Sequence, residues 1–195
     1  MTAQIGDKYR YNGGSYTIVA MSERMKFRLS DYGITPAWIC TACWAGYWCE
    51  YNITPEGIFL DKLFINSADG TYPPINGVTP SENEDRMRYM GHEVYESLNL
   101  RMPFTGKILL GADFLMEYYI HMGYQQAWAY ETLVEFIFED GILKETVDHS
   151  KTAAAIRKKI SDDREKSDEY DSYESIVKFV EDAFSLDYRT KAWWL

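Results

Sequence analysis

Three stretches of the sequence carry the pattern of β-hairpins, and they constrain the fold more than any other feature. Each places a turn signal between two runs of aromatic and β-branched residues, and Asn, Asp and Gly suit such turns because they tolerate positive φ. The turns are Asn12-Gly13-Gly14, residues 54–57 and residues 139–141, and the paired runs are 9–11 with 16–21, 49–53 with 58–65, and 133–138 with 142–147. The sequence therefore predicts a sheet built from hairpins.

Two further strands are expected between these hairpins. Residues 26–29 alternate charged and apolar side chains, which is typical of a half-buried strand, and residues 107–111 form the apolar run of a buried one. Residues 66–80 are rich in Asn, Asp, Gly, Ser and Pro, so we expect an exposed loop there.

Helices are expected in the middle and at the end of the chain. Ser81 and Glu84 form a capping box, and apolar residues then recur at helical spacing, which predicts a helix over about residues 82–98. The alanine-rich residues 151–160 predict a second helix, and an apolar stripe after Asp171 predicts a third.

These elements predict an α+β fold: a twisted antiparallel sheet of hairpins, one mid-chain helix and C-terminal helices. We expect a core domain over residues 1–149 and an acidic helical extension, residues 150–195, packed on or beside it. A faint internal echo, in which Gly46-Tyr47 and Gly123-Tyr124 each precede a strand, a turn and a strand, suggests a pseudo-symmetric pair of hairpin units.

The residues around these two Gly-Tyr pairs resemble a family of uncharacterised bacterial proteins. That family pairs a Trp-x-Gly-Tyr segment with a later His-Met-Gly-Tyr segment, and the matching residues here are Trp44-Ala45-Gly46-Tyr47 and His121-Met122-Gly123-Tyr124. The resemblance covers roughly residues 26–145. It implies a shape and no activity, because none is assigned to the family.

The charge of the chain narrows the classes of partner. The net charge is −10, and residues 161–187 hold ten acidic side chains against three basic ones. Such a chain repels nucleic-acid phosphates and anionic lipids, so direct nucleic-acid binding is disfavoured and a protein partner with a basic surface is favoured. No stretch approaches the ~20 apolar residues that cross a bilayer, so no membrane anchoring is expected.

Three cysteines, Cys40, Cys43 and Cys49, lie within ten positions. A secreted disulfide framework uses an even number spread along the chain, so we expect thiols and a cytoplasmic location. Three soft ligands with a distant histidine leave a zinc site as a weaker alternative. No cofactor is expected, since no glycine-rich phosphate loop is present.

The aromatic residues between 38 and 130 are the feature most suggestive of function. Their flat faces and polar edges suit either a binding pocket or the core of a sheet. The chain also ends in Trp193-Trp194-Leu195, which we expect to fold back on the domain or to enter a partner. The candidate binding residues are Trp44, Tyr47, His121, Tyr124, Trp128 and Glu131.

Two functions follow from these features. The first is a non-enzymatic cytoplasmic binding protein, of the immunity or inhibitor type, that occupies a protein partner. The second is a small-molecule or nucleotide-binding domain, enzymes included, with a pocket around His121, Tyr124 and Glu131.

Overall fold

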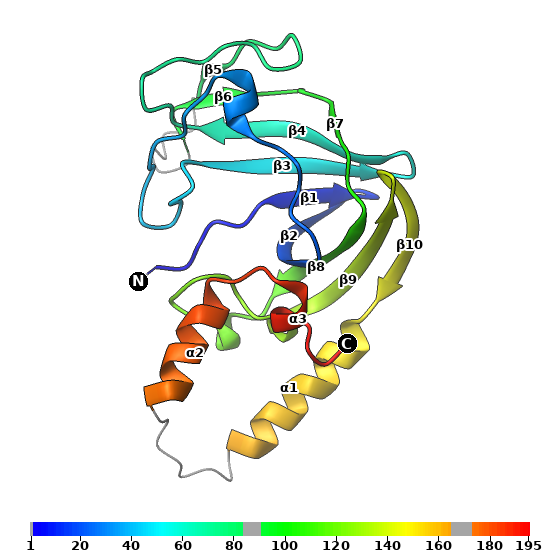
Figure 1. Cartoon of the computed structure of the whole chain (residues 1–195). Coiled ribbons are helices and arrows are strands. Elements are labelled where there is room, and N and C mark those ends of the chain that lie inside the picture. Colours follow the sequence, from blue (N-terminus) through cyan, green and yellow to red (C-terminus); the bar gives the residue numbers. More distant parts are fainter. Residues whose placement is uncertain (1, 84–90, 165–172) are drawn as a thin grey trace.

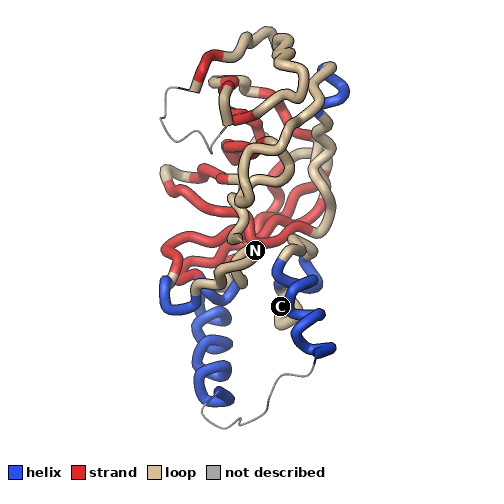
Figure 2. Tube along the Cα trace, turned by 90° about the vertical axis from the view of Figure 1, so that its left-hand side faces the viewer, coloured by secondary structure: helices blue, strands red, loops and turns tan. Residues whose placement is uncertain are grey.

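The computed structural model describes residues 2–83, 91–164 and 173–195 and confirms the α+β fold. Ten strands form one twisted sheet across these residues, and three α-helices gather at one end of it (Figures 1 and 2). Within the same residues, no helix is both long and apolar enough to span a bilayer.

The strands do not follow one another across the sheet in chain order. They are β1 (Lys8–Tyr11), β2 (Gly14–Met21), β3 (Tyr47–Thr54), β4 (Gly57–Ile65), β5 (Ser81–Glu82), β6 (Glu93–Tyr95), β7 (Leu100–Met102), β8 (Gly106–Phe114), β9 (Tyr130–Glu139) and β10 (Ile142–Asp148). Their order is β10-β9-β8-β2-β1-β3-β4-β6-β5, with β7 also paired to β4. The first strand of the sequence, β1, therefore lies in the middle of the sheet.

The helices are mostly C-terminal. They are α1 (Ser150–Arg164), α2 (Tyr173–Ala183) and α3 (Tyr188–Lys191), with short 3₁₀ helices η1 (Leu29–Tyr32), η3 (Met116–Tyr118) and η4 (Ala127–Ala129). The predicted helix over residues 151–160 is thereby confirmed within α1.

All three predicted hairpins are confirmed, as β1–β2, β3–β4 and β9–β10. Asn12 and Gly13 have φ of 48° and 79°, and Asp140 and Gly141 have φ of 51° and 73°. Positive φ at both central residues gives turns whose twist matches that of the strands they join. The expected strand at residues 107–111 lies within β8.

Three expectations are corrected. The sheet is not wholly antiparallel, because β1 pairs parallel with β3, with Tyr9 opposite Tyr51. Residues 26–29 form no strand. Among the described residues no strand pairs with them, and Leu29 is buried at the start of η1. The helix over 82–98 is wrong at its described ends, where β5 and β6 lie, and residues 84–90 fall outside the described residues.

The correction at β6 has a physical reason. Val94 and Tyr95 are buried through pairing with β4, where Tyr95 lies opposite Leu63. Burial against an existing strand outweighs the local spacing of apolar residues, since helical propensity is a weak preference that tertiary contacts override.

Alternation along the strands divides the apolar residues between two faces. On β8, Ile108 and Leu110 enter the main core, whereas Leu109 enters a second core on the opposite face. Ala153 of α1 and Ala192 after α3 complete that second core, so the helices cover this face of β2, β8 and β9. The C-terminal residues therefore pack directly on the sheet, while the proposed domain boundary at 149 stays a prediction.

The sheet curls so strongly that two distant hairpins touch. β4 and β10 are in contact although five strands separate them in the sheet order, and the tips of their hairpins lie side by side (Figure 1). Arg101 of β7 reinforces the meeting point by donating to the carbonyl oxygen of Glu56 at 3.3 Å. The pseudo-symmetry of the two hairpin units stays a prediction.

Candidate functional sites

A cavity of about 560 Å³ opens at the edge of the main core, beside the N-terminal arm. We call it the Asp7 cavity. Asp7, Phe27 and three tyrosines, Tyr47, Tyr51 and Tyr124, line it. A smaller pocket of about 170 Å³ shares Asp7, Tyr47 and Tyr124 and adds Trp44 and Cys43. Both spaces therefore meet at one carboxyl group and two tyrosines.

Asp7 is placed by the parallel pairing of β1 with β3. It directly precedes Lys8, which lies opposite Glu50, so its side chain stands next to the start of β3. There Oδ1 accepts a hydrogen bond from the backbone N–H of Cys49 at 2.8 Å. The backbone oxygen of Asp7 accepts from the N–H of Ile18 at 2.9 Å, which fixes the residue from its other side.

Tyr47 and Tyr124 are each positioned by the glycine before them. Gly46 and Gly123 have φ of 78° and 60°, and a Cβ there would lie 2.3 Å and 2.2 Å from a carbonyl oxygen of a distant segment. Only glycine permits so close an approach in this conformation. The oxygen at Gly123 belongs to Ala183, which also accepts from the N–H of Tyr124 at 2.6 Å.

The two Gly-Tyr segments noted in the sequence therefore have the same structural role. Each uses glycine to press the backbone against another segment, and each then turns a tyrosine toward the Asp7 cavity.

The remaining walls come from residues 21–27 and 184–187. The N–H of Met21 donates to the carbonyl oxygen of Leu186 at 2.8 Å, and Met21 forms a β-bridge with Asp187. The C-terminal segment is thus held against the end of β2 and closes one side of the cavity.

Among Asp7, Tyr47 and Tyr124 in the Asp7 cavity, only Asp7 ionises near neutral pH. Burial raises the pKa of Asp7 to about 6, and the N–H of Cys49 opposes this only in part. Burial, with Asp7 and Cys49 nearby, raises the pKa of Tyr47 to about 12, and burial beside Asp7 also raises the pKa of Tyr124. The tyrosines are therefore neutral hydrogen-bonding groups around a single carboxylate.

The structure separates the predicted binding residues into three places. Trp44, Tyr47 and Tyr124 line the two spaces beside Asp7. His121 is exposed, with Nδ1 3.1 Å from the hydroxyl of Tyr119, and Glu131 is exposed on β9. Tyr124 thus lines a cavity while His121 and Glu131 are exposed, and the pocket predicted around the three stays a prediction.

The cysteines are thiols, as expected. Burial, with Cys40 nearby, raises the pKa of Cys43 to about 11, so its thiol is protonated at neutral pH. Across residues 2–83, 91–164 and 173–195, no three His, Cys, Asp or Glu side chains are grouped as ligands of a metal ion. The alternative zinc site of Cys40, Cys43 and Cys49 is not formed.

Trp128 contributes to a second concave surface, which we call the aromatic cleft. It encloses about 390 Å³ between η3, η4, α2 and α3. Trp193 and Phe179 keep 71% and 44% of their surface exposed there, far more than is usual for large apolar side chains. The lining residues are Glu117, Tyr118, Tyr119, Ile120, Gln126, Trp128, Phe179, Asp182, Thr190 and Trp193.

One wall of the aromatic cleft is rigid. Arg157 of α1 donates to the carbonyl oxygens of Trp128 and Tyr130, each at 2.8 Å, which fixes η4 to the helix. The rings of Tyr118 and Trp128 pack edge to face with centroids 5.2 Å apart. These contacts hold the aromatic rings in place before any partner arrives.

The chain end behaves in two ways. Trp194 packs against the second core, whereas Trp193 points into the aromatic cleft and stays exposed. Of the two outcomes expected for these residues, Trp194 folds back on the domain, and Trp193 stays exposed.

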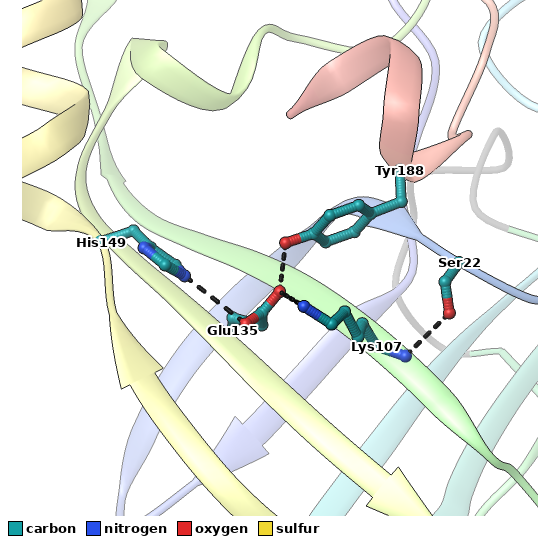
Figure 3. Close-up of polar contacts among 5 residues, drawn as sticks. All are labelled: Ser22, Lys107, Glu135, His149 and Tyr188. Carbon is teal, nitrogen blue, oxygen red and sulfur yellow. Dashed lines mark hydrogen bonds and ion pairs between the residues drawn. The ribbon is translucent and has the colours of Figure 1, made fainter. Parts of the chain in front are cut away.

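A buried carboxylate fastens α3 to the sheet (Figure 3). Glu135 of β9 is 4% exposed and accepts hydrogen bonds from the hydroxyl of Tyr188 and from Nζ of Lys107, the latter at 3.2 Å. His149 Nε2 lies 3.6 Å from the other carboxylate oxygen, which is within ion-pair range and beyond hydrogen-bonding distance. Ser22 accepts from the backbone N–H of Lys107 at 2.8 Å.

These partners keep Glu135 ionised. Burial by itself raises the pKa of Glu135, but the hydrogen bonds from Tyr188 and Lys107 and the nearby basic groups outweigh burial, and the pKa is lowered. Because Tyr188 belongs to α3, and α3 follows the 184–187 wall, this cluster secures the segment that shapes both concave surfaces. We interpret it as a structural anchor.

Comparison of the chain with protein-family models, with curated proteins and with solved structures finds no match. The resemblance based on the two Gly-Tyr segments therefore stays a prediction.

Proposed function

We propose that the protein is a non-enzymatic binding protein that occupies a basic protein partner, in the manner of an immunity or inhibitor protein. The observation that supports this best is the aromatic cleft. Large apolar side chains that stay exposed on a folded domain typically mark an interaction surface, and tryptophan and tyrosine are enriched among residues that dominate binding energy.

The charge of the aromatic cleft favours a basic partner. Among the described residues, its lining includes the carboxylates of Glu117 and Asp182 and no lysine or arginine. The net charge of −10 adds long-range attraction for a basic protein. Aromatic rings beside carboxylates also suit arginine and lysine side chains, which stack on the rings and pair with the acids.

We propose a cytoplasmic location as part of the same function. The three cysteines are thiols, with Cys43 and Cys49 buried, and thiols of this kind persist in reducing compartments.

The test compares two exposed tryptophans. Trp193→Ala removes a ring from the aromatic cleft, whereas the control Trp38→Ala removes a ring that is 61% exposed and lies outside it. Wild-type protein and both variants are immobilised and exposed to a lysate of the native host at low salt and at about 0.5 M salt. The captured protein is then purified and its dissociation constant measured against all three.

We expect a basic protein that binds wild type and Trp38→Ala equally and binds Trp193→Ala at least about tenfold more weakly. Its binding should weaken at high salt, because exposed charges are screened. Capture of no specific protein, capture of an acidic one, or equal binding by Trp193→Ala would each refute the proposal.

A further inference from the structure

The Asp7 cavity is separate from the aromatic cleft, and no described residue lines both. Its chemistry is also different, because the partly buried carboxyl group of Asp7 lies among neutral aromatic side chains. Tyr47, Tyr51 and Tyr124 present rings and hydroxyls, and Phe27 and Phe184 present rings alone. Any ligand that suits this lining must satisfy one negative charge and several π faces.

We infer that the Asp7 cavity is a binding site for a small organic cation, an ammonium or guanidinium group carried on a compact apolar body. The cation would pair with the carboxylate of Asp7 and lie against the tyrosine rings. Aromatic faces attract cations through their quadrupole, and this attraction grows where water is excluded.

The ion pairs of the described residues leave this carboxylate available. The hydrogen-bond partners of Asp7 in that part of the chain are backbone groups: Oδ1 accepts from the N–H of Cys49, and the main-chain oxygen accepts from the N–H of Ile18. None of the salt bridges formed among the described residues includes Asp7. A partly buried carboxylate that forms no ion pair is costly unless a cation joins it.

The outer lining argues against an anion. The charged residues there are Glu23, Arg24 and Asp187, so acidic groups outnumber basic ones even before Asp7 is counted. Arg24 is exposed on the loop after β2 and is flanked by Glu23. A phosphate or carboxylate ligand would therefore meet more repulsion than attraction.

The volume argues for an organic ligand over a bare metal ion. A cavity of about 560 Å³ falls within the range of small-molecule sites. It is lined mainly by rings and hydroxyls, whereas hard metal ions require several oxygen ligands held close together. The described residues provide no group of three acidic, histidine or cysteine side chains suited to a metal.

Acid should weaken binding, because protonation of Asp7 removes the charge that attracts the ligand. Burial raises the pKa of Asp7 to about 6, so at pH 5 only about a tenth of the carboxyl groups are ionised. Among the described residues, the other titratable or charged groups near Asp7 are Tyr9, Glu23, Arg24, Cys43, Tyr47, Cys49, Tyr51, Tyr124 and Asp187.

Isothermal titration calorimetry on the full chain tests the inference with matched probes. Phenethylamine and phenethylguanidine carry one ammonium and one guanidinium group, respectively, on the same phenethyl body, and 2-phenylethanol is their neutral counterpart. The variant Asp7→Asn keeps an oxygen that accepts from the N–H of Cys49 but removes the charge. Glu145→Gln removes the same charge from an exposed position on β10 and serves as the control.

We expect at least one of the two cations to bind wild type at least about tenfold more tightly than 2-phenylethanol does, and to lose about tenfold in affinity between pH 7.5 and pH 5. Asp7→Asn should abolish both effects, and Glu145→Gln should change neither. No binding of either cation at about 10 mM, or equal binding of 2-phenylethanol, would overturn the inference. These results are independent of the partner test at Trp193.

Discussion

The charge on Asp7 should cost the folded protein stability, and Asp7→Asn should recover that stability. Burial raises the pKa of Asp7 from 3.8 to about 6, so the folded chain holds this proton more tightly than the unfolded chain does. The stabilisation from the bound proton is fully present below about pH 3.8 and is lost as the pH rises through about 6. A shift of about two units corresponds to about 3 kcal/mol.

The asparagine variant has no proton to lose at this position. Linkage therefore predicts that Asp7→Asn exceeds the wild type in stability by about 3 kcal/mol at pH 7.5 and by only about 1 kcal/mol at pH 4.5. In a domain of this size the difference at pH 7.5 corresponds to a melting temperature about 6–12 °C higher.

Urea unfolding followed by circular dichroism at both pH values measures this difference. The slope of the unfolding free energy against urea should be the same in the two proteins, because the surface exposed on unfolding is unchanged. Glu145→Gln, at an exposed position on β10, should stay within about 0.5 kcal/mol of wild type at both pH values. A variant that is less stable than wild type at pH 7.5, or a gain that is the same at both pH values, would refute the reasoning.

Three further substitutions probe the contacts around the two concave surfaces, each by urea unfolding. Gly123→Ala should cost at least about 2 kcal/mol more than the control Gly77→Ala, because both glycines have positive φ but only Gly123 lies against the carbonyl oxygen of Ala183; equal costs would contradict the close approach. Glu135→Gln should destabilise by about 1–3 kcal/mol at neutral pH, and the loss should shrink as the pH falls through the lowered pKa of Glu135; a loss that persists unchanged in acid would contradict the anchor. Tyr9→Phe should leave stability unchanged or raise it by about 1 kcal/mol, since the buried hydroxyl has no hydrogen-bond partner within the described residues; a loss above about 1 kcal/mol would indicate a bond to water or to an undescribed residue.

Local patterns in the sequence predict the hairpins well, and for a clear reason. Turn residues such as Asn12-Gly13 and Asp140-Gly141 specify their own backbone conformation, and the flanking runs then pair with their nearest neighbour. The parallel pairing of β1 with β3 has no such signal, because it joins Lys8 to Glu50 across two intervening segments. Everything that depends on that pairing, the Asp7 cavity included, is invisible in the sequence.

The candidate residues follow the same division. Tyr47 and Tyr124 are predictable because a distinctive glycine precedes each one, whereas Asp7 is an ordinary acidic residue near the chain start. Glu135 stands within an apolar strand, and this position marks it as unusual. Its partner Tyr188 lies 53 positions away, so only the folded chain reveals the anchor.

The strip of chain from Phe179 to Trp193 supplies one side of each concave surface. Residues 184–187 border the Asp7 cavity, and residues on both sides of them border the aromatic cleft. A truncation ahead of Ala183 would open both at once, so a shortened chain that fails two binding assays would not show that the two ligands share a site. A ligand that orders this strip by binding at one surface would also strengthen binding at the other. Thermodynamic reciprocity makes the gain in affinity equal in both directions.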